Sequence, residues 1–185
     1  MLVFAVFGLI SSFTLSVEKI HLLENPDANL SCSFNVVLNC ATVMQTWQAE
    51  VFGFPNSYIG LIAYPVVITV AVAGLAGVKF PRRFMAWAQA GYTLGLIFAY
   101  WLFFQSVFVI QILCPWCLVV TVATTIIFET LTRYNLRENN LYLSKKWHKR
   151  AQEWLKKDYD KLLTAGWLVL MIVLVILKFQ DSLIS

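Results

Sequence analysis

The stretch CPWCLVVTVATTIIFETL, residues 114–131, places two thiols at the start of an apolar segment. A proline is tolerated at the first position of a helix, where the backbone N–H has no partner within the helix, so the stretch predicts a helix over 115–131. Cys114 and Cys117 then lie about one turn apart on one face, close enough to form a disulfide. The free N–H groups at this end favour the thiolate, which is the attacking species in disulfide exchange. The stretch therefore indicates a redox-active dithiol where an apolar helix begins.

The composition of the whole chain is that of a helical membrane protein. Of 185 residues, 59% are hydrophobic and only 13% are charged. This is too apolar for an ordinary soluble domain and predicts an all-α membrane protein with one membrane domain. The net charge of +4 is concentrated between the apolar segments, so it gives no indication of a nucleic-acid partner.

Five apolar segments predict five membrane-spanning helices. They cover residues 1–17, 57–78, 84–113, 115–131 and 166–179. The first lacks a basic leader region and a small-residue cleavage site, so we expect a retained span rather than a signal peptide. It is shorter than the roughly 20 residues that cross a bilayer, and whether the true start of the protein lies upstream stays open. The third exceeds that length, so its helix must tilt or project beyond the hydrocarbon.

The polar segments complete a division into three parts. Residues 18–56 form a loop that contains Cys32 and Cys40, and we expect a short helix within it over 41–50. We expect residues 1–131 to form a four-helix core, 132–163 a basic linker, and 164–185 a fifth membrane-spanning segment. Tryptophans and leucines recur at helical spacing among lysines in 144–163, which is typical of an amphipathic helix on anionic lipid headgroups.

The distribution of basic residues predicts the orientation in the membrane. Lys79, Arg82 and Arg83 lie in one short loop, and most other lysines and arginines lie between residues 133 and 161. Because lysine and arginine accumulate in cytoplasmic loops, we expect the amino terminus on the cytoplasmic side. Both cysteine pairs then lie on the extracytoplasmic side, as does the carboxyl terminus. The orientation is predicted from lysines and arginines alone, so the placement of both cysteine pairs on one side is an independent result.

Two cysteine pairs on one side suggest two disulfide couples that exchange electrons. We expect a path from a partner dithiol to Cys32 and Cys40, through a Cys40–Cys114 mixed disulfide to Cys114 and Cys117, and on to a quinone. Thiol exchange needs no metal, and seven residues between the first two cysteines exceed the two to four usual in structural zinc sites. A non-catalytic membrane subunit or transporter with structural disulfides is the alternative, and a thiol reductant that runs electrons in the opposite direction also stays open.

The order of these motifs resembles the vitamin K epoxide reductase family, in particular its bacterial branch. The shared pattern is Cys32 and Cys40, then FGFPNS at 52–57 leading into a span, then CPWC opening a later span. The resemblance covers residues 1–131 and implies a four-helix bundle around a quinone pocket, covered by the loop and a short horizontal helix. It also implies an enzyme that reoxidises a DsbA-like, thioredoxin-fold partner and reduces menaquinone or ubiquinone.

The same resemblance implies roles for single residues. Cys32 and Cys40 are then the shuttle pair, Cys114 accepts electrons from the loop, and Cys117 faces the quinone. Asn56 matches an asparagine that hydrogen-bonds a quinone oxygen, although an asparagine before a helix is by default a cap. The other positions aligned with the pocket are Ile59, Ala63, Leu102 and Trp116.

The chain also departs from the pattern of this family at some positions. Thr121 stands where vertebrate members have a tyrosine, so reduction of vitamin K epoxide itself is not expected. The DsbB family performs related chemistry but has its CxxC in the first outer loop, and the cysteine order here argues against it.

Overall fold

The computed structural model describes residues 1–26, 30–33 and 37–184, with side chains as far as 180. Five of its helices are long and apolar enough to cross a membrane. They are α1 (Leu2–Glu24), α3 (Ser57–Leu75), α4 (Arg82–Phe104) with its π-helical continuation η2 (Gln105–Ile110), α5 (Pro115–Arg137) and α7 (Tyr159–Ile184). The expected fold class, an all-α membrane protein with five spans, is therefore confirmed. Within the described ranges, the only extended pairing is a single bridge between Leu38 and Leu113.

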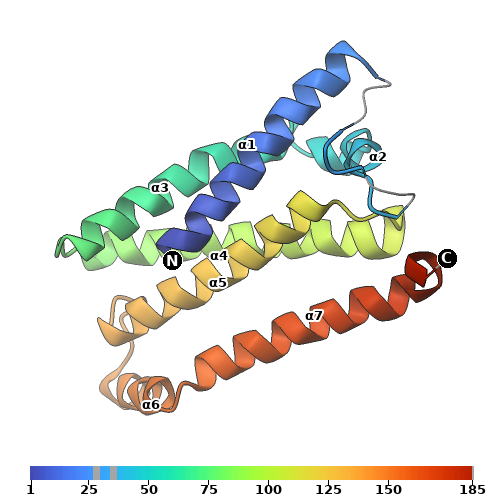
Figure 1. The fold of residues 1–185 in the computed structure, drawn as a ribbon. Coiled ribbons are helices and arrows are strands. Elements are labelled where there is room, and N and C mark those ends of the chain that lie inside the picture. Colours follow the sequence, from blue (N-terminus) through green and yellow to red (C-terminus); the bar gives the residue numbers. More distant parts are fainter. Residues whose placement is uncertain (27–29, 34–36, 185) are drawn as a thin grey trace.

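The first four long helices form a bundle in which α1 packs against α3 and α5, and α4 packs against α5 (Figure 1). Small residues allow α1 and α3 to approach closely. A Cβ atom added to Gly60 would overlap the Ser12 side chain, and one added to Gly8 would overlap the Tyr64 ring. Helix α7 lies along the outside of this bundle and is connected to it by the amphipathic α6 (Lys145–Lys156).

The helix bounds differ from the sequence prediction where polar residues find partners. Helix α1 continues to Glu24 rather than ending at residue 17, so the loop begins later than expected. Glu18 and Lys19 stay within the helix and are buried because both are paired with groups of the following segment. Helix α5 likewise continues past residue 131 to Arg137. In this added part of the helix, Asn135 is buried and its side-chain amide donates a hydrogen bond to the Gln89 side chain.

The third span ends earlier than predicted, at Ile110 instead of residue 113. The helix widens to a π-helix in η2, and Gln111 then takes the left-handed conformation with φ 58°. The Ser106 hydroxyl donates to the Ile112 carbonyl at 2.6 Å, which satisfies a backbone group beyond the helix end. This turn leaves Leu113 extended, immediately before the CxxC motif.

Three further bounds are corrected. The helix expected over 41–50 is two short pieces, α2 (Cys40–Met44) and the 3-10 helix η1 (Trp47–Glu50). The second span ends at Leu75 instead of 78. The amphipathic helix expected over 144–163 ends at Lys156, because Asp158 adopts φ 52° and turns the chain into α7.

The two basic loops meet at one end of the bundle. Arg82 at the start of α4 donates to the Asn139 carbonyl after α5, and its guanidinium lies 4.3 Å from the centre of the Tyr142 ring. Helix α2 and the start of α5 lie at the opposite end, together with the carboxyl terminus (Figure 1). The charge distribution therefore separates the ends of the molecule as the sequence predicts.

Candidate active site

A backbone bridge brings the loop cysteines to the CxxC motif. The Leu113 N–H donates to the Val37 carbonyl at 2.7 Å, and the Asn39 N–H donates to the Leu113 carbonyl at 3.0 Å. Asn39 and Leu113 lie directly before Cys40 and Cys114, and Val37 lies three residues before Cys40. This pairing joins segments 74 residues apart in sequence at their cysteines.

The four cysteines form one disulfide and one dithiol. Cys32 is bonded to Cys40, with 5.7 Å between their Cα atoms, and Cys114 and Cys117 are free. The Cys114 sulfur lies 3.2 Å from the Cys40 sulfur. Both are nearly inaccessible, at 1% and 0% exposure, and Cys32 is 2% exposed. The predicted convergence of the two pairs is thus confirmed.

Cys114 occupies the N-cap of α5, and Pro115 follows at the first helical position as predicted. The Cys114 sulfur accepts a hydrogen bond from the Cys117 N–H at 3.4 Å. The end of a helix that carries unpaired N–H groups stabilises negative charge. Cys114 therefore lies both next to the Cys32–Cys40 disulfide and where a charged sulfur is stabilised.

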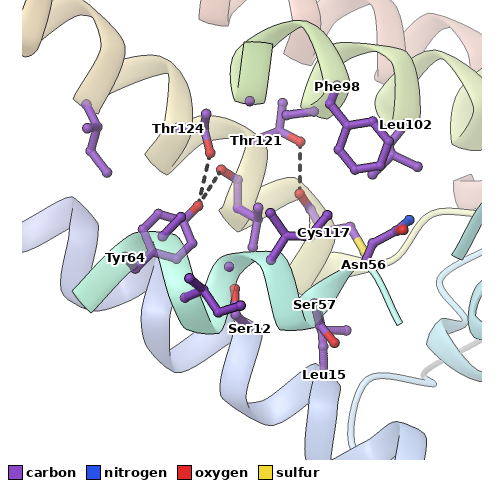
Figure 2. A pocket seen from close by; sticks show the side chains of 18 of the residues that line it. Ser12, Leu15, Asn56, Ser57, Tyr64, Phe98, Leu102, Cys117, Thr121 and Thr124 are labelled. Atoms are coloured by element: carbon purple, nitrogen blue, oxygen red, sulfur yellow. Dashed lines mark hydrogen bonds between the residues drawn. The ribbon is translucent and has the colours of Figure 1, made fainter. Parts of the chain in front are cut away.

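Below the cysteines lies a cavity of about 640 Å³ between α1, α3, α4 and α5. Its walls are largely apolar, and this volume lies within the roughly 300–1,000 Å³ typical of small-molecule sites. Cys114 and Cys117 both line it, and Figure 2 shows Cys117 at its wall. Four of the five residues predicted for a quinone pocket also line it: Asn56, Ile59, Ala63 and Leu102.

Trp116, the fifth, is not among the residues that line the cavity in the described part of the chain. It packs against the buried cluster that surrounds the disulfide, which includes Leu15, Leu22 and Met44. Because successive residues at a helix start point in different directions, Cys117 faces the cavity while Trp116 faces the cluster.

Asn56 lies at the N-cap of α3 but does not cap it with its side chain. Its amide nitrogen donates to the Gln48 carbonyl at 2.7 Å, and its oxygen accepts from the Val51 N–H at 3.3 Å. The side chain therefore holds η1 over the cavity, and the capping role is wrong. A primary amide has two N–H donors, and Gln48 uses one of them.

Sequence reasoning missed Tyr64 and Thr124 on the cavity wall, and for Thr121 it gave no hydrogen-bond partner. Tyr64 and Thr124 are hydrogen-bonded through their hydroxyls at 3.0 Å, and both line the cavity (Figure 2). The Thr121 hydroxyl donates to the Cys117 carbonyl at 2.9 Å within its own helix. A tyrosine in an otherwise apolar span was an available signal, because its hydroxyl needs a partner when buried.

Glu18 and Lys19, at adjacent positions on α1, were also missed. The Lys19 ammonium donates to the Met44 carbonyl at 2.8 Å and pairs with Glu50 at 2.8 Å, which ties α1 to the segment covering the cavity. One oxygen of Glu18 accepts from the Ser31 N–H, and the other lies 3.0 Å from the Cys32 sulfur. Buried charges are seldom found without such partners.

Glu18, Cys32 and Cys40 are close enough to bind a metal ion together, because their ligand atoms lie within 4.8 Å of one another. In the disulfide form, however, the two sulfurs are bonded to each other and neither is a thiolate, the form that binds metal.

The geometry defines a class of protein. A dithiol in contact with a disulfide can exchange two electrons with it, and an apolar cavity beside the dithiol suits a lipid-soluble acceptor, as in membrane thiol–quinone oxidoreductases. The family model of the vitamin K epoxide reductase family matches residues 1–132, and the chain belongs to this family of quinone-reducing, disulfide-forming enzymes. No curated protein matches the chain significantly.

Proposed function

We propose that this enzyme reoxidises a DsbA-like, thioredoxin-fold partner and passes the electrons to a membrane quinone, menaquinone or ubiquinone, so that exported proteins acquire disulfides. The observation that carries the proposal is the contact of 3.2 Å between the sulfurs of Cys40 and Cys114. A sulfur at this distance can attack its neighbour without a large movement of the backbone.

The exchange takes place in three steps. The partner dithiol reduces Cys32–Cys40 and becomes a disulfide. Cys40 then attacks Cys114 of an oxidised Cys114–Cys117 pair, so the Cys40–Cys114 bond forms and Cys117 leaves as a thiolate. Finally Cys32 attacks Cys40, which restores Cys32–Cys40 and releases Cys114. The arrangement of one disulfide and one dithiol supports this order, because it is the state that the third step produces.

The residues around the cavity fit a quinone. Asn56 has an N–H donor for a ring oxygen beyond the one used by Gln48, and Ile59, Ala63 and Leu102 supply apolar contacts. A bound quinone accepts two electrons and two protons, and Cys114 and Cys117 return to a disulfide. Trp116 would then support the cysteines through packing.

The orientation and the division of the chain are part of the proposal. The end with the basic loops lies in the cytoplasm and the cysteine end lies outside, as the positive-inside rule predicts. Residues 1–131 are the catalytic core, 132–163 are a linker at the lipid surface, and 164–185 are a fifth span. The Trp167 indole attaches that span to the core, because it donates to the Tyr100 hydroxyl at 2.9 Å. Within the linker, Arg133 of α5 pairs with Asp160 of α7 at 2.6 Å.

The test combines purified protein, a quinone and a reduced thioredoxin-like partner. Oxidation of the partner should depend on quinone, and Cys117→Ala should abolish quinone reduction, whereas Val119→Ala, on the exposed side of the same helix, should not. Unchanged turnover in Cys117→Ala would defeat the mechanism. If hydroquinone reduced the partner instead, the electrons would flow in the direction opposite to the one proposed.

The alternative, a non-catalytic protein with a structural disulfide, is distinguished by redox titration. A structural disulfide should stay oxidised below about −300 mV, whereas a working couple should titrate at a higher potential. The free dithiol next to the disulfide favours the catalytic function.

A further inference from the structure

Glu18 is a buried carboxyl group to which the mechanism above gives no role. It lies on α1 with 7% of its surface exposed, close to the disulfide. Its Oε1 atom accepts from the N–H of Ser31 at 3.1 Å and also from the Ser31 hydroxyl. Its Oε2 atom lies 3.0 Å from the Cys32 sulfur. One oxygen is therefore held in place and the other is directed at a reacting atom.

For the contact between Glu18 and Cys32 to be a hydrogen bond, one of the two atoms must carry a proton, and which atom carries it depends on the redox state of Cys32. In the disulfide, the Cys32 sulfur carries no hydrogen, so the contact is a hydrogen bond only when Glu18 carries the proton. In the dithiol, the Cys32 S–H group is the donor and the carboxylate accepts. The neighbouring Lys19 is directed elsewhere, to the Met44 carbonyl and to Glu50. At 3.0 Å, a proton can pass directly between Glu18 and Cys32 when the disulfide is formed or broken.

We propose that Glu18 is the general base for Cys32 when this sulfur attacks Cys40 of the Cys40–Cys114 mixed disulfide. The Cys32–Cys40 bond forms, the Cys40–Cys114 bond breaks, and Cys114 leaves with the electron pair as a thiolate. The Cys32 proton goes to Oε2 of Glu18. In the reverse direction, the neutral carboxyl group returns this proton to the leaving Cys32 sulfur. This inference rests on the proposed function, because it concerns one step of that exchange.

The test is Glu18→Gln, which keeps an acceptor for Ser31 but cannot remove a proton. General-base catalysis contributes typically about 10²- to 10⁴-fold, so the attack by Cys32 should slow by that factor. The Cys40–Cys114 species should then accumulate during turnover, as seen on a non-reducing gel after acid quenching and alkylation. The rate of this step in the variant should rise about tenfold per pH unit below the pKa of the free thiol, because only the thiolate attacks. A structural role would not produce this pH profile.

Glu24→Gln is the matched control, because it makes the same charge change at an exposed position of the same helix. Glu18→Asp should retain the pH profile of the unchanged protein at a lower rate. If Glu18→Gln does not fold, infrared difference spectra of the unchanged protein decide: reduction of Cys32–Cys40 should remove a protonated-carboxyl band that shifts in Glu18→Asp. No accumulation in folded Glu18→Gln, an unaltered pH profile, or the absence of that band overturns the inference. The proposed function fails separately, if the unchanged protein does not oxidise the partner.

Discussion

Replacing Lys19 by methionine is expected to loosen the cover of the cavity. Lys19 is the buried cation of α1, and its ammonium binds the Met44 carbonyl at the end of α2 and the Glu50 carboxylate of η1, both at 2.8 Å. Methionine has a similar length and is unbranched, so it fills the same space without either interaction. The expected result is more frequent opening of the segment from α2 to η1, while the bundle itself stays folded.

The magnitude follows from the two contacts. A hydrogen bond that involves a charged group contributes about 1.5–3 kcal/mol. The ion pair contributes at most about 1 kcal/mol, because 40% of the Glu50 side chain is exposed and water screens the charges. Losing both should cost about 1.5–4 kcal/mol, and at 1.4 kcal/mol per factor of ten the open fraction should rise at least about tenfold.

The assay is the rate at which a water-soluble maleimide labels Cys114, which is 1% exposed and packs in the cluster that includes Met44. Mass spectrometry separates labelling at Cys114 from labelling at Cys117. Glu50→Gln removes only the ion pair, so its rate should rise less than about fivefold. Lys145→Met, at the opposite end of the molecule, should have no effect. A rate for Lys19→Met within about twofold of the unchanged protein, or equal to that of Glu50→Gln, would refute the reasoning.

Three other changes test the packing. Tyr64→Phe removes the hydrogen bond to Thr124 and should cost about 1 kcal/mol in thermal unfolding, whereas an unchanged melting temperature would contradict that bond. Gly60→Ala should destabilise by about 1–3 kcal/mol because its Cβ meets Ser12, while Gly74→Ala, which faces open space, serves as control. The Arg133 guanidinium lowers the pKa of Asp158, so their pairing should persist at neutral pH and be lost as the pH falls through that lowered pKa. Asp158→Asn should reduce the acid sensitivity of the Arg133 contacts, leaving only the part that comes from Asp160. An identical acid response would show that Asp158 does not cause it.

Most of the fold could be predicted because hydropathy reports on the environment of a whole segment. The five spans and their order follow from runs of apolar residues, and the start of α5 follows from Pro115. The ends of the helices were less predictable. Residues 18–24 contain charged residues that suggest a loop, yet they are helical because Glu18 and Lys19 are paired by groups that fold onto them. The turn after η2 depends on one residue in the left-handed conformation, Gln111, for which glutamine is not a signal.

The candidate site was predictable to the extent that its residues carry their own chemistry. The cysteines were found from their thiols, and Asn56, Ile59, Ala63 and Leu102 through the family resemblance. Trp116 aligns with a pocket position but packs against the cluster around the disulfide, because alignment does not specify which way a side chain points. Tyr64 and Thr124 were missed because a hydroxyl in a span has a meaning only once its partner on another helix is known.

The sequence by itself determined the chemistry and the two ends of this protein. Thiols supply the redox function, apolar runs require helices in a membrane, and lysines and arginines gather at one end. Each of these properties can be read from single residues or from short runs of residues. The sequence predicted that Cys40 and Cys114 meet, but only the tertiary structure decided how they are brought together and that Glu18 meets Cys32. The contact between Cys40 and Cys114 depends on backbone N–H and C=O groups at Val37, Asn39 and Leu113. Nearly every residue possesses these groups, so the side chains of the sequence give no sign of the contact.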